Sequence, residues 1–265
     1  MLNCLYYSNV KEVGTHIVDW LKGYCEQAQT KGFVVGISGG VDSALTSTLC
    51  AQTGKLTVLV SLPILQDPSQ QKRAERHMQK LKNQFANILC FDISLTEVFQ
   101  VFKSSLQSPV PQHELAMANA RSRLRMTTLY AIAQAHDCLV VGTGNKVEDF
   151  GVGFFTKYGD GGVDLSPIAD LTKSQVWQLA KEVGVLEEII KAKPTDGLWG
   201  EDRTDEEQLG ASYPELEWAM DFNGSEKVLN ARQQEVLRIF RRLNAANQHK
   251  MNPIPVCKIP EDLKG

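Results

Sequence analysis

The sequence of 265 residues is long enough to bury a sizeable core, either as one large domain or as two small ones. Apolar residues make up 43% of it and charged residues 22%, which is typical of a globular protein and excludes disordered, collagen-like and coiled-coil classes. The net charge of −3 argues against general nucleic-acid binding, because proteins that bind the phosphate backbone are usually basic.

Short apolar runs alternate with longer helical segments through the first part of the chain. The runs predict four buried strands, at 33–37, 57–62, 87–91 and 138–141. The segments between them predict helices at 41–52, 68–85, 95–106 and about 114–135. Strands separated by helices imply right-handed crossovers. We therefore expect an α/β fold with a mostly parallel sheet flanked by helices on both faces.

The rest of the chain predicts a helical C-terminal extension. A helix at 171–183, capped by Asp170 or Thr172, is followed by short helices near 186–191, 204–210 and 214–221. A long amphipathic helix follows at 226–248, and its apolar face suits a dimer interface and a core position about equally. No internal repeat and no linker rich in Pro, Gly or Ser interrupts the pattern. We predict one domain over residues 1–265 rather than two.

The N-terminus and the cysteines favour a cytoplasmic protein. No apolar run approaches the roughly 20 residues that span a bilayer, and residues 1–14 lack the basic start of a signal peptide. The six cysteines form no CxxC pair and do not lie at metal-ligand spacing from a histidine. Cys50, Cys90 and Cys138 fall in apolar segments, so we expect reduced thiols, a cytoplasmic location and no membrane partner.

The first strand runs into a turn rich in glycine and serine, Gly36-Ile-Ser-Gly-Gly-Val-Asp-Ser43, after which a helix begins. Ligands of parallel sheets bind outside the carboxyl ends of the strands, where a helix N-terminus offers free N–H groups to an anion. A tight turn capped by Ser or Asp is the alternative. The fingerprints GxGxxG and GxxxxGK[ST] are both absent. Asp42 would repel a phosphate unless a cation such as Mg²⁺ lay between them; alternatively, it only complements the helix dipole.

Three further segments bear on the same site. Gly142-Thr-Gly-Asn-Lys-Val-Glu148 follows the fourth strand, so Glu148 either completes a magnesium site with Asp42 or is a solvated helix charge. The segment 153–162, GFFTKYGDGG, predicts an irregular loop. In the helix predicted at 114–135, Arg121 and Arg125 share a face and Arg123 points away, so the three cannot serve one site. A solvated stripe is the alternative for Arg121 and Arg125.

The motif SGGVDS resembles the pyrophosphate loop of the N-type ATP pyrophosphatases. The chain as a whole is similar to the ammonia-dependent NAD⁺ synthetases of that family. The matching segments, in the family's order over most of residues 33–255, are SGGVDS, RSRLRM, GTGNKVED, GFFTKYGDGGVDLSPI, LTK, PTDGLW and RTDEEQLG. FFTKYGDGG is the most specific of them. The resemblance implies a Rossmann-like fold of the adenine nucleotide α-hydrolase type and a homodimer.

The resemblance also implies a ligase that joins ammonia to deamido-NAD with ATP, through an acyl-adenylate, in the final step of NAD biosynthesis. The products are NAD⁺, AMP and pyrophosphate. For ATP binding it implies Gly36, Ile37, Ser38, Gly39, Gly40, Val41, Asp42, Ser43, Thr143, Lys173 and Thr195. For deamido-NAD it implies Arg123, Lys157, Asp164, His249 and Lys250. Asp42 and Glu148 would hold Mg²⁺ and, with Lys173, form the catalytic set. Asp164 is the candidate base for ammonia.

Three stretches depart from the family's pattern. Residues 62–80 are more basic than expected, so the resemblance assigns no residue there to adenosine. Arg203 and Gln208 stand where many members have Gln and Glu, and the tail reads HKMNPIP where HKR is usual.

Two alternatives stay open. One is another adenylating enzyme with an SGGxDS loop, acting on a nucleobase, a tRNA or an amino acid. The other is a non-catalytic nucleotide-binding protein. The cysteines offer no glutaminase and 265 residues leave no room for a separate glutaminase domain, so free ammonia, or ammonia from a separate partner, is the expected nitrogen donor.

Overall fold

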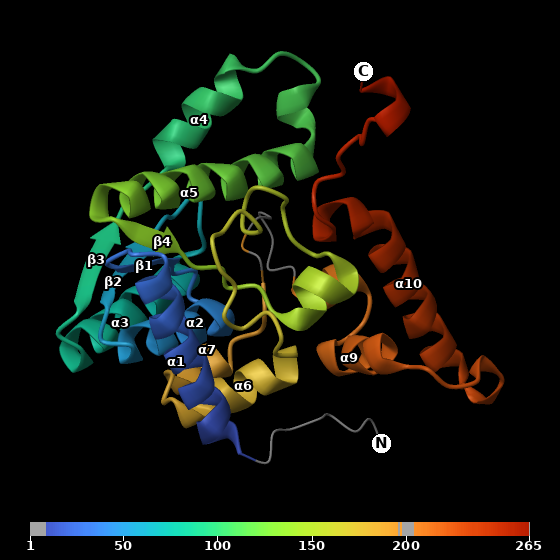
Figure 1. Cartoon of the computed structure of the whole chain (residues 1–265), viewed down its shortest axis with the longest axis horizontal. Helices are drawn as coiled ribbons and strands as arrows, with labels where there is room; N and C mark the ends of the chain where they lie inside the picture. The colour runs from blue at the N-terminus through green and yellow to red at the C-terminus, as the bar shows by residue number, and fades with distance from the viewer. Residues whose placement is uncertain (1–8, 196, 198–203, 265) are drawn as a thin grey trace.

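The computed structural model describes residues 9–195, 197 and 204–264. Within these residues, four parallel strands form a sheet in the order β3-β2-β1-β4 (Figure 1). The strands are β1 (Gly32–Gly36), β2 (Leu56–Ser61), β3 (Ile88–Asp92) and β4 (Cys138–Val140). The α/β fold and all four predicted strands are confirmed. Because β2 and β3 add to one side of β1 while β4 pairs with its other side, the strand order reverses between β1 and β4, which is where such sheets bind ligands.

Helices cover both faces of the sheet, as Figure 1 shows. The helices packed on one face are α1 (Val10–Gln27), α2 (Val41–Gln52), α3 (Pro68–Gln84), α6 (Lys173–Glu182) and α7 (Glu187–Ile190). The elements on the other face are α4 (Thr96–Ser105), the short turn η1 (Val110–Gln112) and α5 (Glu114–His136). Alternate residues of β1 serve the two faces: Val35 is buried in the first core and Val34 in the second. Both faces of β1 are therefore buried, as its continuous apolar run predicts.

Helix α1 is an α-helix that the sequence analysis does not predict. Its N-cap is Asn9, whose side chain accepts a hydrogen bond from the backbone N–H of Glu12 at 3.3 Å. Ile17, Leu21 and Cys25 follow at intervals of four and are buried against the first core. A capping residue followed by this spacing is a helix signal that the sequence contains.

The C-terminal helices build a third core around a π-helical segment, η2 (Val147–Val152). They are α8 (Asp205–Leu209), α9 (Tyr213–Asp221), the turn η3 (Glu226–Val228) and α10 (Ala231–Met251). Helix α10 begins five residues later than predicted, because Asn230 forms a capping box with Gln233 and ends the preceding turn. Val236 and Leu237 of α10 are buried against α9 and η2. The apolar face of this helix thus takes the core position, one of the two roles it suited.

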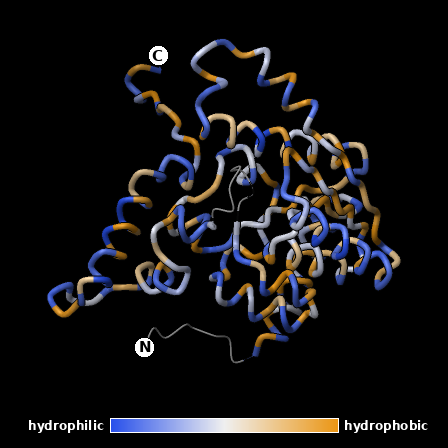
Figure 2. The backbone as a smooth tube through the Cα atoms, turned by 180° about the vertical axis from the view of Figure 1, so that it is seen from behind, coloured by the Kyte–Doolittle hydropathy of each residue, from blue (hydrophilic) through white to orange (hydrophobic). Residues whose placement is uncertain are grey.

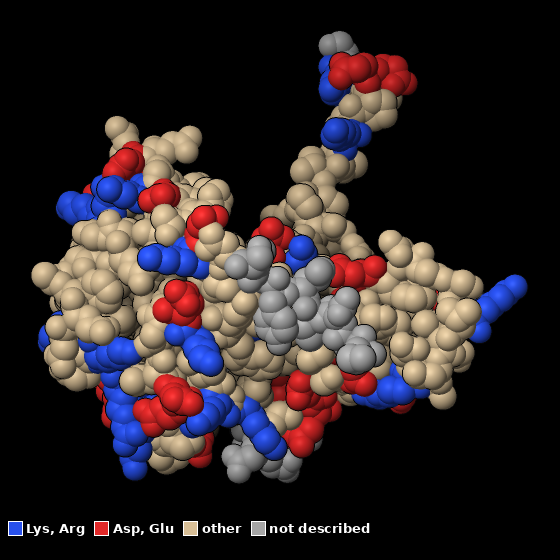
Figure 3. All heavy atoms as spheres, turned by 90° about the horizontal axis from the view of Figure 1, so that it is seen from below, with Lys and Arg blue, Asp and Glu red and all other residues tan. Residues whose placement is uncertain are grey.

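The chain after α10 extends away from the body and ends in a short turn, η4 (Glu261–Leu263) (Figures 1 and 2). Its apolar side chains Ile254 and Val256 are exposed. On the face shown in Figure 3, basic and acidic side chains are interspersed rather than separated. Over the described ranges, no helix is both long enough and apolar enough to span a bilayer.

Candidate active site

A cavity of about 560 Å³ opens at the carboxyl ends of β1 and β4. Its walls come from eight parts of the chain: the turn 36–43, the segment 60–74, helix α5, the stretch 141–163, Lys173, the stretch 192–195, the segment 205–208 and the end of α10. These segments are far apart in sequence and meet at the edge where the strand order reverses. A cavity of this size suits a large ligand.

Hydrogen bonds of Ser38 and Ser43 fix the conformation of the turn 36–43. Ser38 Oγ lies 3.0 Å from Ser43 Oγ, and it accepts a hydrogen bond from the backbone N–H of Gly40 at 3.2 Å. Ser43 Oγ donates to the carbonyl oxygen of Gly40 at 3.0 Å. Gly39 has φ +84°, a left-handed conformation that favours glycine. The turn leads directly into α2, so the helix N-terminus and its unpaired N–H groups face the cavity.

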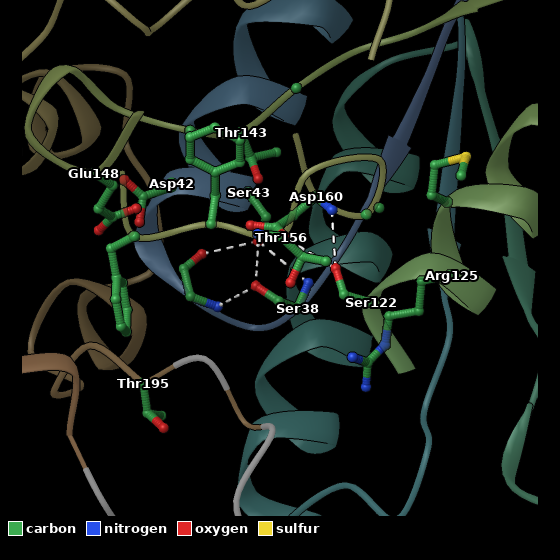
Figure 4. Close-up of a pocket in the computed structure, with 18 of the residues that line it drawn as sticks. Ser38, Asp42, Ser43, Ser122, Arg125, Thr143, Glu148, Thr156, Asp160 and Thr195 are labelled. Carbon is green, nitrogen blue, oxygen red and sulfur yellow. Dashed lines mark hydrogen bonds between the residues drawn. The ribbon is translucent and has the colours of Figure 1, made fainter. Parts of the chain in front are cut away.

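Lys173 links the two predicted metal-binding carboxylates. Its Nζ lies 2.6 Å from Asp42 Oδ2 and 3.0 Å from Glu148 Oε1, and only 2% of its side chain is exposed. Asp42 stands in the first turn of α2, Glu148 in η2, and Lys173 begins α6, where Thr172 is the N-cap as one of the two predicted candidates. Figure 4 shows the carboxylates of Asp42 and Glu148 side by side at one end of the cavity. The structure thus brings together the three residues assigned to catalysis.

Burial and charge compete in this group. Burial would lower the pKa of Lys173, but the carboxylates of Asp42 and Glu148 outweigh it and raise that pKa above its ordinary value. Burial raises the pKa of Asp42 despite the attraction of Lys173. For Glu148, burial is outweighed by Lys173 and the Tyr213 hydroxyl, which lower the pKa. Lys173 therefore stays protonated at neutral pH, and its charge offsets part of the negative charge of the pair.

Two residues that the sequence analysis does not single out complete the group. Asn145 is fully buried; its Nδ2 donates to Asp42 at 3.2 Å, and its Oδ1 accepts from the backbone N–H groups of Val147 and Glu148. Tyr213 donates its hydroxyl to Glu148 Oε1 at 2.5 Å. Asn145 lies inside the matched segment GTGNKVED, so the motif could have identified it as a candidate. Tyr213 lies in a helix distant in sequence and carried no signal.

The donor set fits Mg²⁺. Two carboxylates, those of Asp42 and Glu148, line the same end of the cavity. The same residues contain no group of three or more His, Cys, Asp or Glu that could hold a metal by itself. Mg²⁺ commonly takes one or two carboxylates together with phosphate oxygens and water, so a pair of carboxylates beside a phosphate loop suits it.

A second acidic group also lines this part of the cavity. Burial, reinforced by Glu148, raises the pKa of Asp149 to about 8. Asp160 accepts hydrogen bonds from Ser122 Oγ at 2.7 Å and from the backbone N–H of Thr156 at 3.0 Å, and burial raises the pKa of its carboxyl. Figure 4 shows Asp160 and Ser122 together. The glycine-rich loop 153–162, irregular as predicted, is thereby fastened to α5.

Four of the five residues assigned to deamido-NAD line the cavity: Arg123, Lys157, His249 and Lys250. Their side chains are held by hydrogen bonds to backbone carbonyl oxygens. Arg123 Nε donates to the carbonyl oxygen of Lys157 at 3.3 Å, and Lys157 Nζ donates to that of His249 at 2.5 Å. Lys250 Nζ donates to the carbonyl oxygen of Phe155 at 2.8 Å.

Asp164 is placed differently. It accepts hydrogen bonds from the hydroxyl of Tyr130 at 3.0 Å and the backbone N–H of Val140 at 2.7 Å, and it is not among the residues that line the cavity. The structure therefore does not bring Asp164 together with the other four.

The arginines of α5 divide in an unexpected way. Arg121 lies over the ring of Phe99, 5.6 Å from its centroid. Arg125 instead lines the cavity, and it donates from Nε to the carbonyl oxygen of Leu62 at 3.0 Å and from Nη2 to Gln66 at 2.8 Å. Arg123 and Arg125 are two residues apart and therefore point roughly 200° apart around the helix, yet both line the cavity. Arg125 is thus not a solvated residue.

Thr143 and Thr195, both assigned to ATP, line the cavity, and Figure 4 shows them on different walls. Gln208 lines it too. Arg203 lies outside the described residues, as does Cys4.

Comparisons with known proteins agree over nearly the whole chain. The family model described as NAD synthase matches residues 13–254. The NH(3)-dependent NAD(+) synthetase of Carboxydothermus hydrogenoformans is 37% identical over 246 residues, which cover 91% of this chain and 95% of the relative. The protein of the same name from Mesoplasma florum is 40% identical over 210 residues, 78% of this chain and 83% of the relative.

Solved structures give a similar result. A structure of NMN synthetase from Francisella tularensis superposes with a TM-score of 0.84 at 32% identity, covering 95% of this chain and 98% of that one. The NH3-dependent NAD synthetase from Campylobacter jejuni, in complex with the nitrate ion, has a TM-score of 0.75 at 23% identity over 94% of this chain and 99% of that chain, a likeness of fold.

Proposed function

The chain belongs to the NAD synthase family, and we propose that its cavity joins ammonia to deamido-NAD in a reaction that converts ATP to AMP and pyrophosphate. The observation that carries the proposal is the placement of Lys173 between Asp42 and Glu148, directly beside the turn 36–43. A phosphate-binding turn next to paired carboxylates and a buried cation is the arrangement that phosphoryl and nucleotidyl transfer requires.

ATP would bind with its phosphates at the turn 36–43. The N–H groups at the start of α2 and the helix dipole attract the phosphate oxygens, while Ser38 and Ser43 fix the turn. Asp42 and Glu148 would hold Mg²⁺, which when bound neutralises charge on the phosphates. Thr143 and Thr195 line walls on which the nucleoside part of ATP would rest.

The first step needs no protein nucleophile. The nicotinate carboxylate attacks the α-phosphorus of ATP, the bond to the bridging oxygen breaks, and pyrophosphate leaves, which gives an acyl-adenylate. The protein holds two anions in line and offsets the charge that develops on the phosphate oxygens. Lys173 stays protonated beside this position and suits that role.

The second step is the attack of ammonia on the acyl carbon, with AMP as the leaving group. The acyl-adenylate is a mixed anhydride that water would destroy, so the site must exclude water. The loop 153–162 is fastened to α5 through Asp160 and to α10 through Lys157 and Lys250, and it forms the wall over this part of the cavity. Asp164 has no position in the cavity from which to act as the base.

A second candidate substrate deserves its own test. The Francisella tularensis structure that superposes at a TM-score of 0.84 is of an NMN synthetase, and its 32% identity covers 95% of this chain. The acid substrate on that reading is nicotinic acid mononucleotide, which carries the same reacting carboxylate without the adenylate half. The chemistry at Asp42, Glu148 and Lys173 is the same for both substrates.

We also propose that the chain acts in the cytoplasm as one domain and as a homodimer. The apolar face of α10 is buried within the protomer, so a dimer would form through other surfaces. Val98, Val101 and Phe102 of α4 are exposed, at 50%, 69% and 38%. Light scattering at micromolar concentration tests the dimer; a species of monomer mass alone contradicts it.

One assay tests the proposed function. The purified chain is incubated with ATP, Mg²⁺ and an ammonium salt, and AMP and pyrophosphate are measured with deamido-NAD, with nicotinic acid mononucleotide, and without an acceptor. We expect AMP, pyrophosphate and NAD⁺ in equal amounts with deamido-NAD, and no product when glutamine replaces ammonium. A higher kcat/KM for the mononucleotide would favour the second candidate. AMP release without either acceptor, or no release at all, contradicts both.

A further inference from the structure

Helix α3 packs directly against the turn 36–43. A Cβ atom on Gly39 would lie 2.4 Å from the carbonyl oxygen of Gln70 and 3.3 Å from the backbone nitrogen of Ala74. One turn later, His77 Nε2 of α3 lies 2.9 Å from Ser47 Oγ of α2, and both side chains are buried. Helix α3, which carries most of the basic segment 62–80, therefore packs tightly against the turn 36–43.

Arg73 of α3 reaches around this contact into the cavity. Its Nε donates to the carbonyl oxygen of Gly39 at 3.3 Å, and its Nη1 donates to Ser69 Oγ at 3.4 Å. The side chain is half-buried and lines the cavity together with the turn. Its Nη2 donates to no acceptor within the part of the chain that the structure describes.

The contact with Gly39 orients a peptide group. The carbonyl oxygen of Gly39 points to Arg73, and the N–H of the same peptide, on Gly40, donates to Ser38 Oγ at 3.2 Å. Arg73 and Ser38 thus hold this peptide of the turn 36–43 from its two sides.

Of the carboxylates that the structure describes, Asp67 interacts with Arg73 only weakly and forms no ion pair with it. Among the described residues, none forms an ion pair with it. Asp67, at the N-cap of α3, has its pKa lowered mainly by hydrogen bonds from Ser69, with a smaller contribution from Arg73. A half-buried guanidinium that lines a cavity with free N–H donors is suited to bind a phosphate through two parallel hydrogen bonds.

We propose that Arg73 binds the terminal phosphates of ATP and the pyrophosphate that leaves, from the α3 side of the turn 36–43. This inference rests on the proposed function for the identity of the nucleotide. It gives the basic segment 62–80 a role at the pyrophosphate rather than at the adenosine. Arg73 would hold the leaving group while the Lys173 group serves the opposite side of the α-phosphate.

Titration calorimetry with inorganic pyrophosphate in a buffer containing MgCl₂ tests the proposal without any amidation. The variants are Arg73→Gln and Arg73→Lys. Arg76→Gln is the matched control, because Arg76 lies on the same helix but pairs at the surface with Glu188, at 2.7 Å. Steady-state kinetics then give KM for ATP and for deamido-NAD. Circular dichroism establishes that each variant is folded.

We expect Arg73→Gln to weaken pyrophosphate binding about tenfold or more, since a hydrogen bond to a charged group is lost. KM for ATP should rise by a similar factor, and KM for deamido-NAD by less than twofold. Arg73→Lys keeps the charge without the paired donors, so its loss should be smaller but above threefold; it decides the matter if Arg73→Gln does not fold. Arg76→Gln should bind as wild type does.

Pyrophosphate binding by Arg73→Gln within twofold of wild type, an equal loss in Arg76→Gln, or no binding by wild type overturns the role of Arg73. A wild-type chain that binds pyrophosphate but makes no NAD⁺ contradicts the proposed function alone. The calorimetric difference between Arg73→Gln and wild type still decides the role of Arg73 in that case.

Discussion

The ammonium group of Lys173 lies 2.6 Å from Asp42 Oδ2 and 3.0 Å from Glu148 Oε1, and its side chain is almost completely buried. The three residues come from α6, α2 and η2, so this contact fastens the C-terminal part of the chain to the first helix after β1. When both carboxylates are ionised, the two carboxylates and one ammonium carry a net charge of −1 at the edge of the cavity. The group is therefore both a structural link and a site prepared for a further cation.

Removal of Lys173 should destabilise the protein and abolish its activity. Lys173→Met leaves two buried carboxylates without their partner, a change that typically costs about 3–5 kcal/mol of unfolding free energy. Asp42→Asn and Glu148→Gln keep one partner for Lys173, so they should lose activity with a smaller loss of stability. Urea unfolding and the AMP-release assay measure the two effects.

The same variants report on the metal. Because Lys173 no longer repels a cation in Lys173→Met, added Mg²⁺ should restore part of the lost unfolding free energy of this variant and stabilise it more than it stabilises wild type. Wild-type turnover in either carboxylate variant would remove that residue from the proposed site.

Replacement of Gly39 should damage the phosphate turn. In Gly39→Ala the new Cβ would lie 2.4 Å from the carbonyl oxygen of Gln70, so α3 must move away from the turn. Gly54→Ala is the matched control, since Gly54 also has a positive φ, +74°, but nothing lies within 4 Å of its Cβ position. Gly54→Ala should cost only the backbone strain, about 1 kcal/mol, without changing KM for ATP.

Gly39→Ala should cost more stability than Gly54→Ala and raise KM for ATP at least tenfold. Thermal melts and ATP titrations of the two variants make the comparison. Equal behaviour of both would mean that the approach of α3 to the turn has no bearing on nucleotide binding.

Lys157→Ala should affect the acid substrate and not ATP. Lys157 lines the cavity next to Arg123 and His249, far along the chain from the phosphate turn. Loss of a hydrogen bond to a charged group is worth about 1.5–3 kcal/mol, which is roughly ten- to hundredfold in KM for deamido-NAD. Lys191→Ala, at an exposed pair with Glu187, is the control. Equal changes in KM for both substrates would take Lys157 out of the acid's binding site.

His77 should make stability depend on pH. Burial, together with Lys80, lowers the pKa of His77 to about 4 from an ordinary 6.5. The folded protein therefore keeps this imidazole neutral while the unfolded chain takes up a proton, so the stabilisation is complete above about pH 6.5 and is lost as the pH falls toward 4. Between pH 7 and 5 the loss due to His77 is about 2 kcal/mol.

His77→Gln can keep the bond to Ser47 but cannot titrate. Its unfolding free energy should therefore fall by about 2 kcal/mol less than that of wild type over this interval. His16→Gln, at an exposed position of α1, should follow wild type. Parallel pH profiles for wild type and His77→Gln would contradict the assignment.

Much of the fold could be predicted because its strands are short, continuous apolar runs separated by helical segments. Gly32–Gly36 and Cys138–Val140 are examples, and the helices between such runs predict the parallel sheet in which these two strands pair. The π-helical form of Val147–Val152 and the late start of α10 could not be predicted, since both depend on contacts with residues distant in sequence.

Some residues of the site could likewise be predicted from the sequence, and others could not. Asp42 and Glu148 follow neighbouring strands, so their approach could be predicted from topology alone. The resemblance, rather than any spacing, supplied Lys173. The roles of Tyr213 and Arg125 could not be predicted from the sequence. Tyr213 of α9 donates a hydrogen bond to Glu148, and Arg125 lines the cavity although it lies on a different face of α5 from Arg123.

The most direct test of the account follows the oxygen atoms of the acid. Deamido-NAD labelled with ¹⁸O in the nicotinate carboxylate is converted in one turnover, and AMP is analysed by mass spectrometry. Attack of the carboxylate on the α-phosphorus, followed by attack of ammonia on the acyl carbon, predicts one ¹⁸O atom in AMP for each NAD⁺ formed. NAD⁺ formed together with unlabelled AMP would contradict the acyl-adenylate, and with it the role of the cavity as the place where the carboxylate and the α-phosphate meet.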